Sequence, residues 1–283
     1  MAYSPSLLKK TIFHFWGGDF YCYREKISKE AGFKQRVKER SKRFFARYCF
    51  KNCGELAFLI PGEYEAFCKI FRFSRSYSVA KMPSNPRQKR LSEFRNQHTH
   101  SGTRILLGNS ATESNCHGEI LELLKNQYGD EEIEVVCPLS YGERGCKERV
   151  IACGKELLGE KFVPMTEYID KDAYYEFLDD CDIGIFNNNR QQAMGNINAM
   201  LGMGKKVYIR SSTCMWDFFR GKGAVLFPVE EIQKQSFRDF ISFPADIRDR
   251  NTKIYDENNP TENSLNAWVP LLRKVVAKNK KQA

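Results

Sequence analysis

Residues 182–210, DIGIFNNNRQQAMGNINAMLGMGKKVYIR, carry the pattern that decides the fold. Residues 183–186 form a short apolar run typical of a buried strand, and residues 206–209 form another. Between them, residues 195–203 space their apolar side chains as a helix does. A strand, a loop, a helix and a second strand in this order make the repeating unit of a parallel sheet, so the segment predicts an α/β fold.

The polar loop inside this segment predicts a ligand site. In a parallel sheet, ligands bind outside the carboxyl ends of the strands, and a helix N-terminus offers unpaired N–H groups to an anion. Arg190 is the only cation of the loop, and Gln191 and Gln192 can both donate and accept hydrogen bonds. Gly195 lets a ligand approach the backbone closely. We therefore expect a phosphate-bearing small molecule at residues 190–196.

The alternation of strands and helices continues over the C-terminal two thirds of the chain. It predicts a Rossmann-like domain at residues 103–260, followed by a C-terminal helix at residues 261–283. The expected strands are 104–108, 132–138, 161–164, 182–186, 206–210 and 223–227, and the expected helices are 114–128, 146–159, 171–180, 195–203 and 214–220, with more helix from about 234.

The first turn of this domain, GNSATESN at residues 108–115, is a second candidate anion site, because it leads from a strand to a helix N-terminus. Its candidate contacts are Gly108, Asn109, Ser110 and Asn115. An equal alternative is that Ser114 or Asn115 only caps the helix. The turn is not a G-x-G-x-x-G fingerprint, so no nicotinamide cofactor is expected. The next turn adds Tyr141 as an aromatic wall.

The N-terminal part of the chain predicts a smaller domain at residues 1–100. Residues 7–15 are interpreted as a strand that ends in a Gly-Gly turn, which displays His14, Trp16 and Asp19 at its carboxyl end. The competing interpretation is a plain turn in which Trp16 packs and Asp19 caps the next helix. Further along we expect a basic helix at 23–50, a strand at 55–60, a helix at 63–71 and a linker at 72–102, with the domain boundary near 95–103.

The charge of the chain is concentrated in this first part. The net charge is +10, and residues 1–100 hold 21 Lys and Arg against 8 Asp and Glu. Such a basic surface suits nucleic acid, an anionic membrane or a phosphorylated substrate. Basic residues interleaved with aromatic ones at 23–50 fit a helix on an anionic bilayer, although an ordinary solvated helix face has the same pattern. No RNP-type segment, zinc finger or clear helix-turn-helix signature supports nucleic acid.

Composition excludes several classes of protein. A chain of 283 residues with 42% hydrophobic residues and a mean hydropathy of −0.54 is globular and not disordered. No apolar run approaches the roughly 18 residues of a membrane span, and the start lacks the form of a signal peptide, so a cytoplasmic protein is expected. The ten cysteines contain no C-x-x-C, and reduced thiols are expected. Asp180 and Asp182 precede a strand, at the wrong end of the sheet for a ligand, so no metal is assigned.

Several motifs in register resemble one family over nearly the whole chain. They are HFWGGDFY at 14–21, LLGNSATESNCH at 106–117, VCPLSY at 136–141, DAYYEFLDDCDIGIF at 172–186 and RQQAMG at 190–195. Together they resemble the enterobacterial TDP-N-acetylfucosamine:lipid II N-acetylfucosaminyltransferases, of the 4-alpha-L-fucosyltransferase type (glycosyltransferase family 56). The resemblance implies a GT-B fold, in which two Rossmann-like domains face each other across a cleft.

The resemblance also implies an activity. Members of that family transfer 4-acetamido-4,6-dideoxygalactose from a nucleotide-diphosphate donor to an undecaprenyl-diphosphate-linked saccharide at the inner membrane face, with inversion and without a metal or other cofactor. The implied donor contacts are Gly108, Asn109, Ser110, Asn115, Tyr141, Arg190, Gln191, Gln192 and Gly195. Asp19 or His14 is the implied base for the acceptor hydroxyl. The implied localisation is cytoplasmic and peripheral on the inner membrane, with the basic helix facing anionic lipid.

Two departures from the family pattern lead to further expectations. The family has Gly where this chain has Ala193. The family's N-terminal domain is also longer than the 100 residues available here, so we expect an incomplete, N-terminally shortened domain. This leaves two alternatives to a transferase: a nucleotide-sugar-binding remnant without activity, or a basic nucleic-acid-binding protein.

Overall fold

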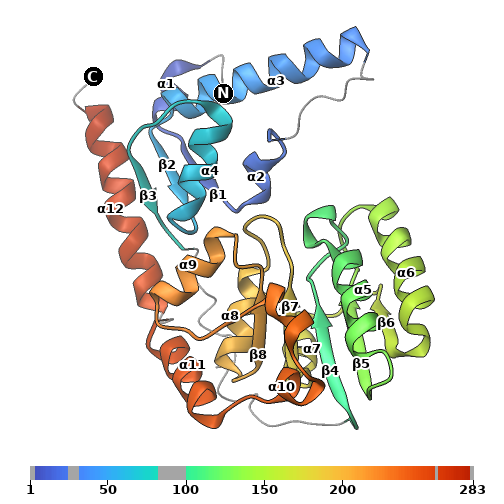
Figure 1. Ribbon diagram of the computed structural model, residues 1–283. Helices are drawn as coiled ribbons and strands as arrows, with labels where there is room; N and C mark the ends of the chain where they lie inside the picture. Colours follow the sequence, from blue (N-terminus) through green and yellow to red (C-terminus); the bar gives the residue numbers. More distant parts are fainter. Residues whose placement is uncertain (1–3, 25–31, 82–99, 259–260, 281–283) are drawn as a thin grey trace. The chain divides into compact units, whose positions relative to one another are not determined.

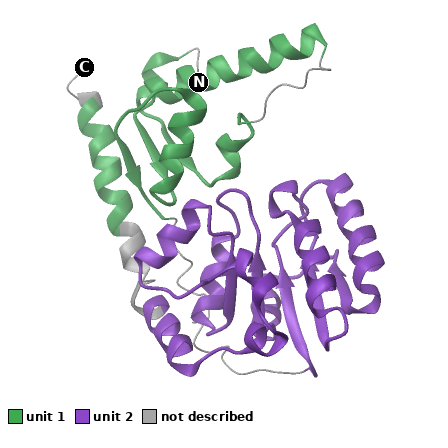
Figure 2. Cartoon of the chain, viewed as in Figure 1, with its two compact units in different colours: residues 1–87, 260–283 green, residues 88–259 purple. Residues whose placement is uncertain are grey.

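The computed structural model describes residues 4–24, 32–81, 100–258 and 261–280. The chain divides into two compact units. Unit 1 comprises residues 1–87 and 260–283, and unit 2 comprises residues 88–259 (Figure 2). Each unit contains one parallel sheet with helices packed on it (Figure 1).

Unit 1 has a three-stranded sheet of order β1-β2-β3. Strand β1 pairs with β2 from Ile12↔Glu55 to Phe15↔Phe58, and β3 pairs with the other edge of β2. Phe15 and Phe58 stack with their ring centroids 5.0 Å apart inside an aromatic core. The elements are α1 (Pro5–Lys9), β1 (Ile12–Phe15), α2 (Gly18–Tyr21), α3 (Phe33–Asn52), β2 (Glu55–Phe58), α4 (Gly62–Phe71), β3 (Tyr77–Val79) and α12 (Thr261–Lys280).

The strand predicted over residues 7–15 is wrong in its first half. Residues Pro5–Lys9 form α1, because Pro5 sits in the first turn, where its fixed φ suits a helix. The Thr11 hydroxyl then donates to the Leu7 carbonyl (2.9 Å) where the helix ends. Strand β1 still ends at Phe15, so the Gly-Gly turn follows a strand as predicted.

The helix and the linker predicted in this unit also change. Helix α3 is described from Phe33, and residues 25–31 of the predicted helix lie outside the described residues. The predicted linker contains β3, which pairs with β2. The sequence prediction misses this strand, because three residues are too few to show an alternating pattern. Residues 82–99 of that linker lie outside the described residues as well.

Unit 2 has a six-stranded parallel sheet of order β6-β5-β4-β7-β8-β9. The elements are β4 (Thr103–Leu107), η2 (Glu113–Asn115), α5 (His117–Tyr128), β5 (Ile133–Pro138), α6 (Arg144–Leu158), η3 (Gly159–Lys161), β6 (Phe162–Met165), α7 (Lys171–Asp179), β7 (Ile183–Phe186), α8 (Met194–Gly202), β8 (Lys206–Ile209), α9 (Cys214–Gly221), β9 (Phe227–Pro228), η4 (Val229–Lys234), α10 (Phe237–Ile241) and α11 (Ala245–Asn258). The predicted strand 223–227 is wrong, because pairing with β8 begins only at Phe227.

The order of the strands creates a reversal point between β4 and β7. The chain runs outward from β4 to β5 and β6, and then returns to β7 on the other side of β4. Open α/β sheets bind ligands at such a point, outside the carboxyl ends of the strands. The register from Ile105↔Ile183 to Leu107↔Ile185 brings the loops that follow these two strands side by side (Figure 1).

Among the described residues, no helix combines the length and the apolar composition that crossing a bilayer requires.

Candidate functional site

The loop after β4 begins with a glycine that no other residue replaces easily. Gly108 has a φ of 70°, and a Cβ at this position would lie 2.7 Å from His117 Nε2. The predicted helix at 114–128 is interrupted at Cys116, whose φ is 50°, and α5 begins at His117. No side chain caps α5, so the alternative in which Ser114 or Asn115 is only a helix cap is wrong.

Asn115 holds this loop together. Its Oδ1 accepts a hydrogen bond from the Asn109 backbone N–H (3.1 Å), and its Nδ2 donates to the carbonyls of Ser110 and Thr112 (3.1 and 3.3 Å). Asn115 is fully buried. The amide of this predicted ligand contact is thus engaged within the loop, and Asn115 shapes the loop from inside.

The loop after β7 is hydrogen-bonded to the loop after β4. Asn188 Nδ2 donates to Asn115 Oδ1 (3.0 Å), and the Asn189 backbone N–H donates to the Ser114 carbonyl (2.9 Å). The predicted contact Gln192 donates through Nε2 to Ser110 Oγ (2.9 Å). One hydrogen-bond network therefore joins the two loops of unit 2.

Helix α8 begins directly after the second of these loops. Its N-cap is Ala193, whose φ of 58° is left-handed and whose side chain has no group that could cap the helix. The first N–H groups of a helix have no partner within it. Gly195, in this first turn, is exposed, and a Cβ built there would meet no atom within 4 Å. Open space thus lies where the helix dipole favours an anion.

The two cations at this edge of the sheet differ in what they contact. The half-buried Arg190 donates through its guanidinium to the Gln191 carbonyl of the same loop (3.1 Å). Arg210, at the end of β8, donates to Asn187 Oδ1 (3.0 Å) and to Glu119 Oε2 (2.5 Å). Glu119 thus neutralises Arg210, whereas Arg190 lies in the loop that leads directly into α8.

Three side-chain oxygens of the two loops are buried and have no hydrogen-bond partner among the described residues. They are Asn109 Oδ1, Asn188 Oδ1 and Gln191 Oε1. None of these residues is more than 8% exposed. A buried acceptor without a partner costs about 1–3 kcal/mol, so such atoms in a folded protein mark a place where a donor is missing.

Tyr141, from the loop after β5, stands beside these amides. Its hydroxyl accepts a hydrogen bond from Asn109 Nδ2 (2.9 Å), while the side chain is 60% exposed. The loop is fixed by its backbone, because the Ala111 N–H donates to the Tyr141 carbonyl (2.8 Å). The ring is therefore exposed while its hydroxyl is anchored, and its role as an aromatic wall of a ligand site stays a prediction.

The two predicted catalytic residues both lie in unit 1, His14 within β1 and Asp19 in α2, just after that strand. Asp19 is exposed, and its Oδ2 accepts a hydrogen bond from the Trp16 backbone N–H (2.6 Å). His14 Nε2 bonds the Ala80 carbonyl (2.7 Å), and His14 Nδ1 accepts from the Trp16 indole N–H (2.9 Å). Since a carbonyl only accepts and an indole only donates, His14 carries its proton on Nε2. Burial also lowers the pKa of His14.

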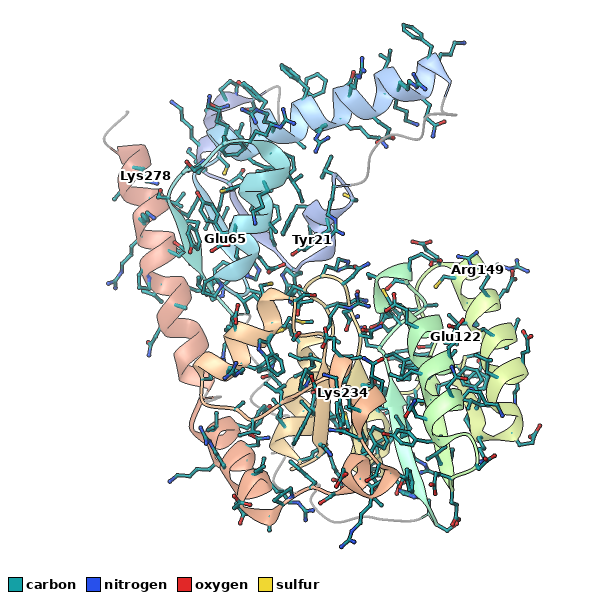
Figure 3. The ribbon with its side chains drawn as sticks, viewed as in Figure 1. Tyr21, Glu65, Glu122, Arg149, Lys234 and Lys278 are labelled. Carbon is teal, nitrogen blue, oxygen red and sulfur yellow. The ribbon has the colours of Figure 1, made fainter. Side chains whose placement is uncertain are left out.

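The surroundings of the cysteines decide whether their thiols ionise. All ten cysteines are free, and burial raises the pKa of Cys53 and of Cys146 to about 11, which leaves them as thiols. Cys146 lines a cavity of about 360 Å³ between α5 and α6, beside Arg149 (labelled in Figure 3).

Asp180 and Asp182 both contact Arg104. In the part of the chain that the structure describes, no group of three or more His, Cys, Asp and Glu side chains is placed to hold a metal ion.

Asn188 is the residue that the sequence interpretation missed. It is the middle of the Asn187–Asn189 run, in which Asn187 and Asn188 are both buried, and nothing in three identical letters shows that the oxygen of Asn188 has no hydrogen-bond partner among the described residues. The nine predicted ligand contacts, by comparison, all lie in unit 2 in the loops after β4, β5 and β7, or in the first turn of α8. The sheet order brings these loops to one edge.

Comparison with known proteins identifies related sequences and folds. The sequence model of a family described as 4-alpha-L-fucosyltransferase, glycosyl transferase group 56, matches residues 6–265. Among solved structures, a glycosyltransferase from Rickettsia africae is 12% identical, with a TM-score of 0.63 over 94% of this chain and 70% of that one. A sucrose-phosphate synthase from Thermosynechococcus elongatus is 9% identical, with a TM-score of 0.71 over 94% and 68%.

A third solved structure, WaaG, a glycosyltransferase involved in lipopolysaccharide biosynthesis, is 13% identical, with a TM-score of 0.65 over 93% of this chain and 74% of that one. At these identities the likeness concerns the fold alone. Together with the two parallel sheets, it confirms the α/β, GT-B-like fold class that the sequence predicts.

Proposed function

Because the chain belongs to the 4-alpha-L-fucosyltransferase family, glycosyl transferase group 56, and is therefore a glycosyltransferase, we propose a specific pair of substrates for it. The donor is a thymidine-diphosphate (TDP) sugar carrying an N-acetylated deoxyhexose such as 4-acetamido-4,6-dideoxygalactose. The acceptor is an undecaprenyl-diphosphate-linked saccharide in the synthesis of a surface polysaccharide like enterobacterial common antigen. The reaction inverts the anomeric carbon and needs no metal.

One observation carries the donor half of this proposal, namely the joined loops at the reversal point of the unit 2 sheet. The uncapped N-terminus of α8 and the open space at Gly195 suit a diphosphate group. Arg190 adds a positive charge beside them. A helix N-terminus and an arginine can stabilise the charge that grows on the departing diphosphate, and this supports transfer without a cation.

The contacts of the two candidate bases favour Asp19. An inverting transfer needs one group to accept the proton of the acceptor hydroxyl while its oxygen attacks the anomeric carbon and the bond to the diphosphate breaks. Both ring nitrogens of His14 are engaged, one with Ala80 and one with Trp16. Asp19 keeps an exposed carboxylate in the same turn. We therefore assign the base to Asp19 and a positioning role to His14.

Helix α3 supports the membrane half of the proposal. Its inner side packs through Ala46, Cys49 and Phe50 on the core of unit 1. On the opposite side, Phe33 is 82% and Phe44 is 66% exposed.

At 100° per residue, these two phenylalanines and the exposed Val37 and Tyr48 fall within an arc of about 60°. The helix carries eight Lys and Arg and one Glu. An exposed apolar stripe flanked by cations is typical of a helix lying on an anionic bilayer, where the lipid-linked acceptor would be found.

Vesicle sedimentation tests this surface. We expect the wild-type protein to bind vesicles that contain phosphatidylglycerol and not vesicles of phosphatidylcholine alone. Replacing both Phe33 and Phe44 by Ser should weaken this binding at least tenfold, because the bilayer would no longer bury these two aromatic side chains. Tyr168→Ser, at an 84% exposed position of unit 2, is the control. Equal binding of the double variant and the wild type would remove α3 from the membrane surface.

Transfer of a radiolabelled sugar from a TDP-sugar to lipid-linked saccharide tests the activity itself. We expect transfer by the wild-type protein, and a melting temperature that rises when TDP is added. Arg190→Ala should abolish the rise. Asp19→Asn should bind TDP normally and transfer at least a hundredfold more slowly, as expected for a lost general base. Full activity of Asp19→Asn would exclude it as the base.

The same assay separates the two alternatives that the sequence leaves open. A nucleotide-sugar-binding remnant would bind TDP and transfer nothing. A nucleic-acid-binding protein would instead show salt-sensitive binding of DNA or RNA that is independent of TDP. The described residues offer a polar loop site and an apolar stripe on the most basic helix, and these features favour the transferase.

A further inference from the structure

The buried amide oxygens of the donor loops share one chemical property. Asn109 Oδ1, Asn188 Oδ1 and Gln191 Oε1 are hydrogen-bond acceptors, and none has a partner among the described residues. A diphosphate offers only acceptors at neutral pH, so it cannot satisfy these atoms. The groups that can are hydroxyls and amide N–H groups.

The orientation of the Asn188 amide follows from its neighbours. Asn115 Nδ2 lies within hydrogen-bond distance of two carbonyl oxygens, which only accept, and Asn115 Oδ1 must therefore be the acceptor for its other contacts. Asn188 places its Nδ2 on that oxygen at 3.0 Å. The Asn188 carbonyl oxygen is thus left as the atom without a partner, in a side chain that is fully buried.

Asn109 is the immediate neighbour of Asn188 in this network. The Asn109 backbone N–H donates to the same Asn115 Oδ1 at 3.1 Å, so the two residues meet at one atom. Asn109 also holds the exposed Tyr141 ring through its Nδ2. Two unpartnered amide oxygens and an aromatic ring, whose apolar face and polar tip suit a ligand of mixed polarity, therefore lie together.

We infer that Asn188, together with Asn109, reads the sugar of the donor by accepting hydrogen bonds from a hydroxyl or an acylamino N–H group. This inference rests on the proposed donor class. It divides the site into a cationic part at Arg190 and α8, which takes the diphosphate, and a neutral accepting part, which takes the sugar. Because both oxygens are buried, the side chains that cover them have to shift when the sugar enters.

Such a site discriminates between ligands through the free-energy cost of leaving a buried acceptor without a hydrogen bond. A sugar that brings a donor to each oxygen relieves buried acceptors, whereas a ligand that brings no donor to them leaves them unpaired. Sites built to pair with a substrate hydroxyl or N–H discriminate strongly against ligands that lack it. Asn188 should therefore affect the affinity for the TDP-sugar and leave the affinity for TDP nearly unchanged.

Calorimetric titration of the full chain tests this difference. The probes are TDP, TDP-glucose, which has hydroxyls only, and TDP-4-acetamido-4,6-dideoxygalactose. We expect Asn188→Ala to weaken at least one TDP-sugar tenfold or more and TDP less than threefold. The TDP-sugar that is affected tells whether a hydroxyl or the acetamido N–H is read. Asn109→Ala, which keeps the contact between Asn115 and Asn188, should show the same pattern if Asn188→Ala folds poorly.

Ser114→Ala is the matched control for a purely structural role. It removes the bond from Ser114 Oγ to Gln192 Oε1 (2.6 Å), which joins the same two loops without an unpartnered oxygen. It should change the affinities for TDP and TDP-sugar by the same factor. The inference is overturned if Asn188→Ala also changes both affinities equally, or changes neither. If the wild-type protein binds none of the three probes, the proposed function itself fails.

Discussion

Ala193 occupies a position whose backbone conformation suits glycine. Its φ of 58° costs a residue with a Cβ about 1–2 kcal/mol, and the family pattern has Gly here. Such strain is often found at functional sites, and this one lies at the first turn of α8. The loop before α8 thus carries this strain at a cost in stability.

The first prediction follows from this strain. Ala193→Gly should raise the free energy of unfolding by about 0.5–1 kcal/mol, measured by urea denaturation. Ala199→Gly, the same replacement inside α8 at a buried position, should instead lower it by about 1 kcal/mol. If both variants were destabilised alike, Ala193 would not be strained in solution.

His117 makes the stability of unit 2 depend on pH. Burial lowers its pKa to about 4, from 6.5 in an unfolded chain. Between these two values the unfolded state binds more protons, so stability rises with pH across this window and is lost as pH falls from 6.5 to 4. The full effect is about 3 kcal/mol. His117→Gln should reduce this slope, and equal slopes for variant and wild type in denaturation series across the window would contradict the burial of a neutral imidazole.

Gly195 provides a test of the diphosphate position at the level of one methyl group. The open space at this residue predicts that Gly195→Ala folds normally. We expect the same methyl group to weaken TDP binding at least tenfold, because it fills the space where the backbone meets the diphosphate. Gly118→Ala, in the first turn of α5 with equally open surroundings, should leave TDP binding unchanged. Normal binding by Gly195→Ala would place the diphosphate elsewhere.

At the scale of the elements, sequence patterns predict helices and strands that are long enough to show a period, and they miss shorter ones. The β7–α8–β8 unit is predicted within two residues at each boundary, because an apolar strand and a helical period follow each other without interruption. Helix α1 and strand β3 are missed, since five and three residues carry no period. The break at Cys116 is missed because one left-handed residue leaves no trace in a helical pattern.

The candidate site shows the same division. The glycines, Arg190 and the glutamines are found from residue type, because their chemistry is visible in the letters. The roles of Asn115 and Asn188 depend on which amide faces which loop, and only the register of β4 against β7 decides that. Sequence therefore locates the loops, and tertiary contacts show which hydrogen bonds the individual amides make.

The end of α3 depends on one side chain from the segment before β3. Arg75 Nη1 donates to the carbonyls of Phe50, Lys51 and Cys53 at 2.9–3.1 Å. These carbonyls belong to the last turn and the C-cap, which have no helical partners. Arg75→Ala should lower the free energy of unfolding of unit 1 by about 2–3 kcal/mol. The exposed Lys69→Ala is the control, and similar stabilities for the two variants would argue against this cap.

On the scale of the whole molecule, the chain leaves unit 1, forms unit 2 and returns. Helix α12 packs on unit 1 through Leu271. Its Lys274 and Lys278, the second of which is labelled in Figure 3, pair with the buried Glu55 of β2 at 2.9 and 3.1 Å. A C-terminal helix was expected from the sequence, but its packing site depends on contacts more than 200 residues apart in the chain. Unit 1 thereby holds both the candidate base and the basic helix, and unit 2 holds the donor loops.

Amide hydrogen exchange with and without a saturating TDP-sugar tests the central claim most directly, because it locates a bound ligand without changing the protein. If the joined loops hold the donor, residues 108–116 and 187–196 should both become protected, while α6 and α10 should exchange as before. Binding of the TDP-sugar without protection of these two segments, or with protection confined to other parts of unit 2, would contradict the account.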